Sequence, residues 1–349
     1  MNALKNKLKL FIKQYPSLWD IYWSIKQQIK RILLLRYFLY DAANCYKAMY
    51  WRVDQIESKA LSSELFFQFH KLEKGMSMPG PRRFFGREPA LKVAELVCRW
   101  RSKGLPLNSP VYVGAVEALV AYRNRLIDHV AEAGLGFIAE IESALEICTE
   151  RNNYLSTPIR LEKMLDEANA KSTLLKLANA RRSVRRFEDT PVPREAIEFA
   201  TKVAQLSPSA CNRQPVIVYC IKERKEIDAL LGYQNGNRGF GHRVPFLIVL
   251  ATDERCFFDA SERHEPYIDA GLFSMSFILG LQACGLSSCC LNWCVPPATD
   301  KVVHSNFKIP EQSRIAMLIA VGYAEADCVV PRSPRRDLAE VLLDLPRRS

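Results

Sequence analysis

The sequence predicts an α+β protein in two parts: an all-helical region over residues 1–170 and a region of alternating helices and strands over residues 171–349. In the first part apolar residues recur at helical spacing, as the four isoleucines between residues 21 and 32 do. In the second part short apolar runs, such as residues 245–251, alternate with helical patterns. With 349 residues, of which 48% are hydrophobic, the chain can bury a sizeable core in one large domain or in two.

Proline and glycine mark the ends of the expected helices. In the first part, beyond a helix around residues 21–33, helices are expected over 54–72, 88–103, 110–131 and 136–151. In the second part helices are expected over 172–182, 193–206, 223–231, 265–284 and 297–305, and strands over 215–221, 245–251, 286–292 and 314–322. Residues 272–281 are apolar around nearly the whole helix. This helix must therefore be buried on all sides, in a large core or against a second subunit.

Two neighbouring segments carry the chemistry. The basic segment, residues 181–187, reads Arg-Arg-Ser-Val-Arg-Arg-Phe, and guanidinium groups bind phosphate in a bidentate manner. The 208–215 loop reads Pro-Ser-Ala-Cys-Asn-Arg-Gln-Pro, and its side-chain amides can pair with the polar edge of a heterocycle. Together they favour a phosphorylated aromatic cofactor. The alternatives are a solvated basic surface and an ordinary turn.

The order and spacing of these segments resemble the opening motifs of the nitroreductase-like flavoenzymes. Further stretches match that family in the same order, at residues 244–251, 267–271, 283–289, 315–323 and 335–341. The resemblance covers about residues 172–345. It implies a three-layer fold, with a mixed or antiparallel central sheet flanked by helices, that holds FMN at the interface of a homodimer.

The resemblance also implies a set of cofactor-binding residues. Arg181 and Ser183 would lie near the FMN phosphate and Arg185 near the ring, while Arg335 would hold the phosphate from the C-terminal element. Arg182 is counted in the same set, although solvent exposure is the favoured alternative for it and for Arg186.

The flavin ring would be lined from the partner subunit by Pro208, Ser209 and Asn212. Gln214 would join them or only hold the loop. Asn237, in the glycine-rich residues 236–241, would pair with the pyrimidine edge of the ring in both directions. A glycine-rich hairpin turn is the alternative for that stretch.

These residues predict an FMN-dependent oxidoreductase. NADH or NADPH would reduce the flavin, and the flavin would reduce a second small-molecule substrate by ping-pong hydride transfer: a nitroaromatic, a quinone or a pathway intermediate. No catalytic side chain is assigned, because FMN carries the chemistry. The alternative function is a flavin-fold binding or scaffold protein of a membrane-associated glycan-synthesis complex.

Residues 70–75 read His-Lys-Leu-Glu-Lys-Gly and resemble the leader region of nitroreductase-like proteins of bacterial surface-polysaccharide synthesis. His70, Glu73 and Lys74 can share one helix face. An exposed ion pair followed by a capping glycine is the favoured interpretation, and a lid over the substrate pocket is the alternative.

The net charge of +11 is concentrated near the start of the chain: residues 1–50 hold nine basic and two acidic residues. The apolar stripe of residues 21–33 is expected to pack on the protein's own core, and peripheral contact with an anionic membrane is the alternative. No nucleic-acid-binding motif is present, so no such partner is expected. The eleven cysteines and the absence of a secretory signal predict reduced thiols, no metal site and a cytoplasmic protein, with attachment to the inner face of the membrane as the alternative.

Overall fold

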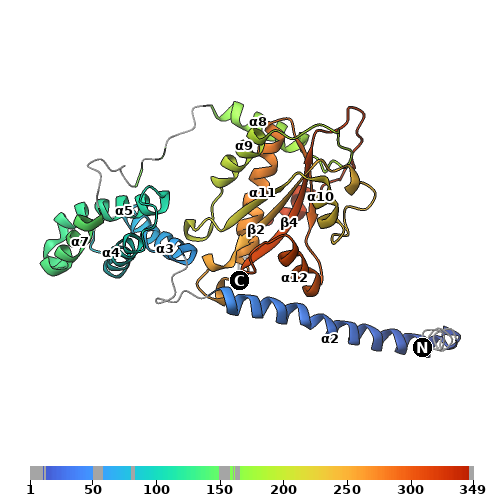
Figure 1. Cartoon of the computed structure of the whole chain (residues 1–349), viewed down its shortest axis with the longest axis horizontal. Helices are drawn as coiled ribbons and strands as arrows, with labels where there is room; N and C mark the ends of the chain where they lie inside the picture. Colours follow the sequence, from blue (N-terminus) through green and yellow to red (C-terminus); the bar gives the residue numbers. More distant parts are fainter. Residues whose placement is uncertain are drawn as a thin grey trace.

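The computed structural model describes residues 11, 13–49, 58–79, 83–148, 158–159, 161 and 166–345. Figure 1 shows a long helix α2 (Pro16–Ala48), a bundle of helices and a sheet-bearing domain. Helix α8 (Glu167–Ala180) crosses residue 170, where the sequence predicts the boundary between the two parts. The boundary itself stays a prediction.

The sheet has four strands in the order β1-β2-β4-β3, and every neighbouring pair is antiparallel. Its strands are β1 (Val216–Ile221), β2 (Phe246–Asp253), β3 (Ser287–Asn292) and β4 (Ser313–Gly322). These bounds lie within two residues of those that the apolar runs predict. A bulge between Leu250 and Ala251 interrupts the pairing of β2 with β4. The predicted α+β class is therefore confirmed, with the antiparallel form of the sheet.

Helices cover both faces of the sheet, which makes the three predicted layers (Figure 1). Helices α9 (Arg194–Gln205) and α11 (Glu265–Ala283) pack against one face, where Phe246, Ile248 and Leu250 of β2 point. The alternate residues Leu247 and Val249 point to the other face, which is covered by α10 (Arg224–Leu231) and α12 (Pro297–Asn306). Strand β2 is buried along its whole length, as a central strand with two covered faces must be.

The helical bundle has a core of its own. Its main helices are α3 (Ser58–Met76), α4 (Arg87–Ser102), α5 (Pro110–Leu126) and α7 (Leu135–Cys148). The single helix expected over 110–131 is wrong: α5 ends at Leu126 and continues as η1 (Ile127–His129) and α6 (Val130–Ala133). Helix α6 ends at Gly134, whose φ of 81° is in the left-handed region. The core includes Leu65, Leu96, Leu119 and Ile141.

The glycine in the motif of residues 70–75 does not cap a helix. Gly75 lies inside α3, which ends at Met76. A Cβ atom at Gly75 would overlap the Phe85 ring, at 2.0 Å from its edge. The predicted capping role is therefore wrong, because the glycine is needed where an aromatic ring approaches the backbone.

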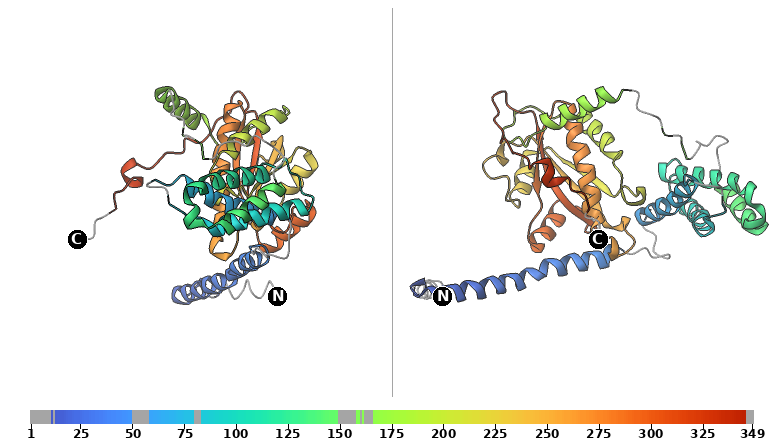
Figure 2. Two further views of the ribbon diagram at one scale, coloured as in Figure 1. Left: turned by 90° about the vertical axis from the view of Figure 1, so that its left-hand side faces the viewer. Right: turned by 180° about the vertical axis from the view of Figure 1, so that it is seen from behind.

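Helix α2 runs outward from the foot of the sheet domain (Figures 1 and 2). Within it Ile25, Ile29 and Ile32 are 55%, 52% and 65% exposed. Its buried residues are Cys45 and Ala48, in the last turn. The expectation that the apolar stripe packs on the protein's own core is therefore wrong, since α2 contacts the domain only near its C-terminal end. None of the described helices combines the length and the apolar content that a bilayer span requires.

Candidate functional site

The basic segment is attached to the edge of the sheet at β3. Helix α8 ends at Ala180, and Arg181 takes an extended conformation that turns the chain toward the sheet. Ser183 then forms a parallel bridge with Ser288, and the Val184 N–H donates to the Ser288 carbonyl at 3.1 Å. The segment therefore has a defined position beside the strand.

Arg181 and Arg185 of this segment act electrostatically on thiols of β3. The Arg185 guanidinium is 5.9 Å from the centroid of the Phe240 ring. Burial raises the pKa of the Cys289 and Cys290 thiols, and the charges of Arg185 and Arg181, respectively, oppose that rise. Both cations therefore act on the same edge of the sheet.

Two further arginines of the segment have protein partners. Arg182 Nη2 donates to the Arg332 carbonyl at 3.0 Å, which ties the C-terminal segment to the basic segment. Arg186 is exposed and pairs with Glu325 at 2.6 Å and with Asp327 at 3.2 Å. Arg186 therefore fits the favoured surface interpretation, whereas Arg182 is half-buried.

Arg335 lies on the exposed C-terminal segment, three residues beyond the carbonyl that Arg182 holds. Its Nη1 donates to the Ser333 carbonyl at 2.6 Å. None of the described contacts joins the Arg335 side chain to Arg181, Ser183 or Arg185. The structure therefore brings the C-terminal segment to the basic segment without bringing this guanidinium to the others.

The 208–215 loop has an unusual backbone. Cys211, Asn212 and Gln214 have φ angles of 49°, 55° and 50°, in the left-handed region that favours glycine. The loop is held in this conformation by its own hydrogen bonds: the Gln214 N–H donates to Ser209 Oγ at 3.1 Å, and the Ala210 N–H donates to the Asp269 carboxylate at 3.2 Å. Strained backbone that the surroundings hold in place is typical of ligand-binding sites.

Arg213 holds the loop in place from within, a role that its sequence context does not predict. Its side chain is fully buried and pairs with Glu262 at 2.5 Å, while its Nε donates to the Ala210 carbonyl at 2.8 Å. The guanidinium also lies 5.8 Å from the Phe67 ring of α3 and 5.1 Å from the Phe257 ring. A charged residue among turn residues is typical of a surface, so no local signal marked its burial.

The loop borders a small cavity of about 100 Å³ under α11. Pro208, Ser209, Gln214 and Asp269 line it, with Phe273 of α11. No residue of the basic segment lines this cavity. Among the described residues of one chain, the predicted phosphate-binding and ring-binding groups therefore lie apart.

Residues 178–233 and 229–323 match the model of the Nitroreductase family. The sheet domain belongs to the nitroreductase family. Its relatives by sequence include the iodotyrosine deiodinase of Danio rerio, 24% identical over 218 residues, with 54% of this chain and 72% of that protein covered.

Solved structures of this family also resemble the nitroreductase domain. A nitroreductase family protein from Streptococcus pneumoniae TIGR4 is 22% identical, with a TM-score of 0.42, and covers 49% of this chain and 100% of its own. An FMN-dependent nitroreductase from Clostridium difficile R20291 is 19% identical, with a TM-score of 0.42, and covers 50% of this chain and 99% of its own. The bundle and α2 lie outside the residues that the family model matches.

Within the nitroreductase domain, Asn237 is engaged in its own loop. Its Nδ2 donates to the carbonyls of Leu231 and Gln234 at 2.8 and 2.6 Å. In this structure the amide hydrogens already have acceptors within the loop, so the oxygen is the part of the side chain left for the predicted pairing with a ring edge. The hairpin alternative is wrong, since the stretch leads from α10 through η3 (Gly241–Arg243) into β2.

Asp269 supports the 208–215 loop from α11, and burial raises its pKa to about 6, while the hydrogen bond from the Ala210 N–H opposes the rise. A carboxyl with a raised pKa holds its proton in the folded state between about pH 4 and 6, where the unfolded chain releases it. Its contribution to stability therefore decreases as the pH rises through this window.

We expect Asp269→Asn to remove this decrease. Relative to wild type, the variant should gain up to about 3 kcal/mol in free energy of unfolding between pH 4 and pH 7, as a pKa difference of about two units implies. Urea denaturation at both pH values measures the difference. Asp189→Asn, at an exposed position, is the control for the loss of one negative charge. If both variants gained the same free energy of unfolding, the raised pKa of Asp269 would not be the cause, and the expectation would be contradicted.

Proposed function

We propose that the chain is an FMN-dependent oxidoreductase, with residues 171–349 as the FMN-binding domain and residues 1–170 as a helical region. The observation that carries the proposal is the basic segment, which lies beside β3 inside the part of the chain that matches the nitroreductase family. Arginine and serine side chains at this position suit a phosphate ester, since they offer charge-assisted hydrogen bonds.

In this proposal Arg181, Arg182 and Ser183 hold the phosphate side of FMN, and Arg335 reaches the phosphate from the C-terminal segment. Arg185 lies near the ring. Pro208, Ser209, Asn212 and Gln214 line the ring of the second subunit's cofactor. The phosphate-binding and the ring-lining residues lie apart within one chain. This separation supports their assignment to two subunits, because a complete FMN site then needs residues from both copies of the chain. Asn237 contributes only an acceptor oxygen.

Bound FMN supplies hydride chemistry, accepting electrons from NADH or NADPH and reducing a nitroaromatic, a quinone or a pathway intermediate. The side chains bind and orient the cofactor. The rigid 208–215 loop keeps the ring-facing groups in place, since Arg213 and Asp269 hold its backbone. The motif at residues 70–75 supports a link to bacterial surface-polysaccharide synthesis.

Replacing Arg181 or Arg335 by alanine should weaken FMN binding about ten-fold or more, because each loses a charge-assisted contact worth roughly 1.5–3 kcal/mol. Quenching of flavin fluorescence on titration of the apoprotein measures the affinity. Arg186→Ala is the matched control, since Arg186 pairs with Glu325 and Asp327. The control should bind FMN as the wild type does.

Unchanged affinity in both Arg181→Ala and Arg335→Ala would contradict the assignment of the phosphate site. A purified protein that is colourless and binds no added FMN would contradict the enzyme itself and favour the scaffold alternative. Bleaching of a yellow preparation by NADH or NADPH identifies the electron donor.

We propose a homodimer, because α11 exposes an apolar stripe although its sequence predicts burial on all sides. Ile268, Leu272 and Met275, one helical turn apart, are 51%, 43% and 46% exposed. The C-terminal segment around α13 (Leu338–Val341), which leaves the domain in Figure 2, exposes Leu342 and further aliphatic residues. A second copy would cover both surfaces.

Sedimentation of the holoprotein should therefore give a dimer. Leu272→Glu with Met275→Glu should shift it to a monomer, because two carboxylates would be buried in an apolar interface, and FMN occupancy should fall with it. Ile147→Glu, on the exposed face of α7, is the control and should remain dimeric. A flavin-loaded wild-type monomer would contradict the proposal.

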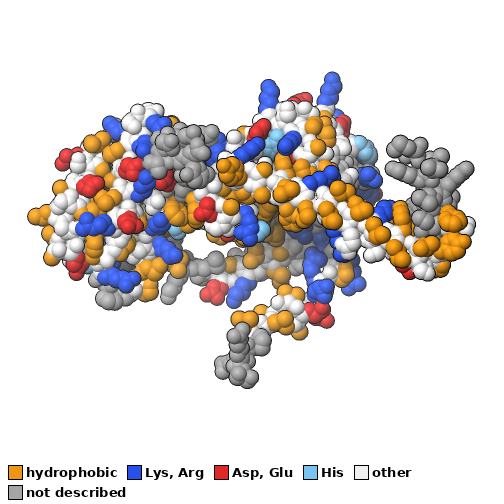
Figure 3. Space-filling model, turned by 90° about the horizontal axis from the view of Figure 1, so that it is seen from below, with side chains coloured by type: hydrophobic (Ala, Val, Ile, Leu, Met, Phe, Trp, Pro, Cys, Tyr) orange, Lys and Arg blue, Asp and Glu red, His pale blue; other side chains and the backbone are white. Residues whose placement is uncertain are grey.

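We also propose peripheral contact of α2 with an anionic membrane. On an ideal helix Leu18, Ile21, Ile25, Ile29 and Ile32 share one face, and all five are exposed. Figure 3 shows apolar and basic side chains interspersed along this helix. A second copy of α2 would bring like charges together. An anionic bilayer can bury the apolar stripe and also attract the lysines.

Flotation with anionic vesicles at low salt tests the membrane contact. Wild type should float, and Ile25→Glu with Ile29→Glu should lose at least about ten-fold in binding, because apolar burial is lost and repulsion from the lipid is added. Ser24→Glu with Gln27→Glu, on the polar face, adds the same charge and should lose less. Equal losses in the two variants, or a wild type that stays unbound, would contradict the contact.

A further inference from the structure

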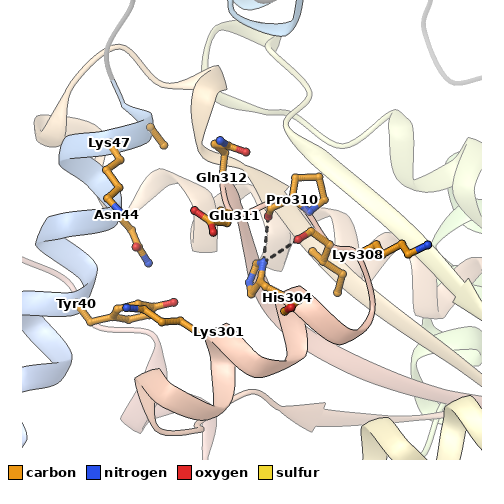
Figure 4. A pocket seen from close by; sticks show the side chains of 12 residues that line it. Tyr40, Asn44, Lys47, Lys301, His304, Lys308, Pro310, Glu311 and Gln312 are labelled. Carbon is orange, nitrogen blue, oxygen red and sulfur yellow. Dashed lines mark hydrogen bonds between the residues drawn. The ribbon is translucent and has the colours of Figure 1, made fainter.

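A cavity of about 520 Å³ lies where the end of α2 meets α12 and the residues that follow it (Figure 4). Tyr40, Asn44 and Lys47 of α2 form one wall. Lys301 of α12 and Glu311 with Gln312 belong to the opposite side. We name it the α2–α12 pocket. It shares no lining residue with the basic segment or with the 208–215 loop.

The walls of the pocket are fixed by contacts between α2 and the nitroreductase domain. The Tyr40 hydroxyl donates to Asp300 Oδ2 at 2.7 Å, and Trp293 Nε1 donates to Asp300 Oδ1 at 2.6 Å. Asp41, the next residue of α2, pairs with Arg314 at 2.5 Å. Both oxygens of Asp300 therefore have donors, and α2 is held against α12 at this end.

His304 shapes the floor. It is buried, and its Nδ1 donates to the carbonyls of Ile309 and Pro310 at 3.2 and 3.0 Å. These bonds, drawn in Figure 4, fold the chain after α12 back against the helix. Lys308, at a φ of 53° in this turn, extends its amine away from α2 in Figure 4. Lys308 therefore lines the pocket with its amine on the side away from α2.

The lining of the pocket includes Lys47, Lys301 and the carboxylate of Glu311. Lys301 Nζ lies 5.6 Å from the centroid of the Tyr40 ring, and Lys47 lies beside Asn44 on α2 (Figure 4). Neither lysine forms an ion pair with any described carboxylate. Glu311 is the acidic group of the wall, so the lining retains an excess of positive charge. Asn44 and Gln312 add donors and acceptors that suit hydroxyl groups.

We propose that the α2–α12 pocket binds a phosphoester that carries hydroxyl groups, of the glycerol phosphate type. The ammonium groups of Lys47 and Lys301 would share the phosphate, as lysines do at phosphate sites. The hydroxyl groups of the ligand would form hydrogen bonds with the carboxamides of Asn44 and Gln312 and with the Glu311 carboxylate. The carboxylate accepts hydrogen bonds from hydroxyl groups, and its negative charge keeps the phosphate on the side of the lysines. The volume suits a small organic ligand.

Such a group has two sources. One is a soluble phosphorylated polyol, and the other is the headgroup of a phospholipid. The pocket lies at the C-terminal end of the same helix that carries the exposed isoleucines, so a bilayer contacting α2 would have headgroups near it. The proposal does not depend on flavin chemistry, and its test leaves the FMN site intact.

The soluble source is tested by calorimetric titration of the full-length holoprotein with sn-glycerol 3-phosphate. Lys47→Gln and Lys301→Gln should each weaken binding about ten-fold, the effect of losing one contact to a charged group. Lys103→Gln, exposed on the bundle, is the matched control and should bind as the wild type does. FMN occupancy and melting temperature should be unchanged in all three variants.

The lipid source is tested with phosphatidylglycerol vesicles in a phosphatidylcholine background. Lys47→Gln with Lys301→Gln should reduce vesicle binding, and excess sn-glycerol 3-phosphate should compete with the vesicles for the wild type. Lys26→Gln with Lys30→Gln removes the same charge from the exposed part of α2 and should leave the competition intact. This control separates the pocket from the general attraction of α2 to lipid.

Binding of the soluble ester without competition assigns the soluble source, and competition assigns the lipid headgroup. Both outcomes support the pocket. The proposal is overturned if sn-glycerol 3-phosphate neither binds to wild type nor competes with the vesicles, or if the double variant Lys47→Gln with Lys301→Gln binds both probes as tightly as wild type. An intact yellow protein in that case would leave the proposed oxidoreductase unaffected.

Discussion

The buried ion pair between Arg213 and Glu262 is the interaction on which the arrangement of the parts depends. The guanidinium is surrounded by the rings of Phe67, Phe257 and Phe258, and water is excluded from it. Removing one partner of such a pair leaves an uncompensated buried charge, at a cost of about 3–5 kcal/mol. Because Phe67 belongs to α3, the same pair connects the helical bundle with the 208–215 loop. The bundle therefore contributes to the loop conformation.

A second ion pair has the corresponding role for α2. Arg314 of β4 bonds both Glu254 and Asp41, at 2.6 and 2.5 Å, and so joins the sheet to the base of the helix. Tyr40, which donates to Asp300 at 2.7 Å, adds a second contact at this base of the helix. A helix of 33 residues is about 50 Å long. Because the described contacts attach α2 to the sheet domain only near its C-terminal end, most of this length extends into solvent. The α2–α12 pocket and the proposed membrane contact therefore both depend on this attachment of α2.

The proposed flavin site depends on a constraint of another kind. One chain places its basic segment beside β3 and its strained loop under α11, and the described contacts do not join them. Ile268, Leu272 and Met275 of α11 are exposed to solvent. A second copy would cover that surface and supply the missing half of each site, so the oligomeric state and cofactor binding are linked.

The sequence by itself determined the order of the main elements and the bounds of the strands, since hydrophobic periodicity is local: β1 and α11 lie within a residue or two of their expected ends. It also located the basic segment and the 208–215 loop, because a cluster of arginines and a run of amide residues between two prolines can be recognised from the order of residues alone. Only the tertiary structure decided that Arg213 and His304 are buried, that Asn237 is engaged in its own loop and that the stripe of α2 is exposed. The physical reason is that burial depends on which distant residues cover a side chain, and no local pattern of residues specifies that cover.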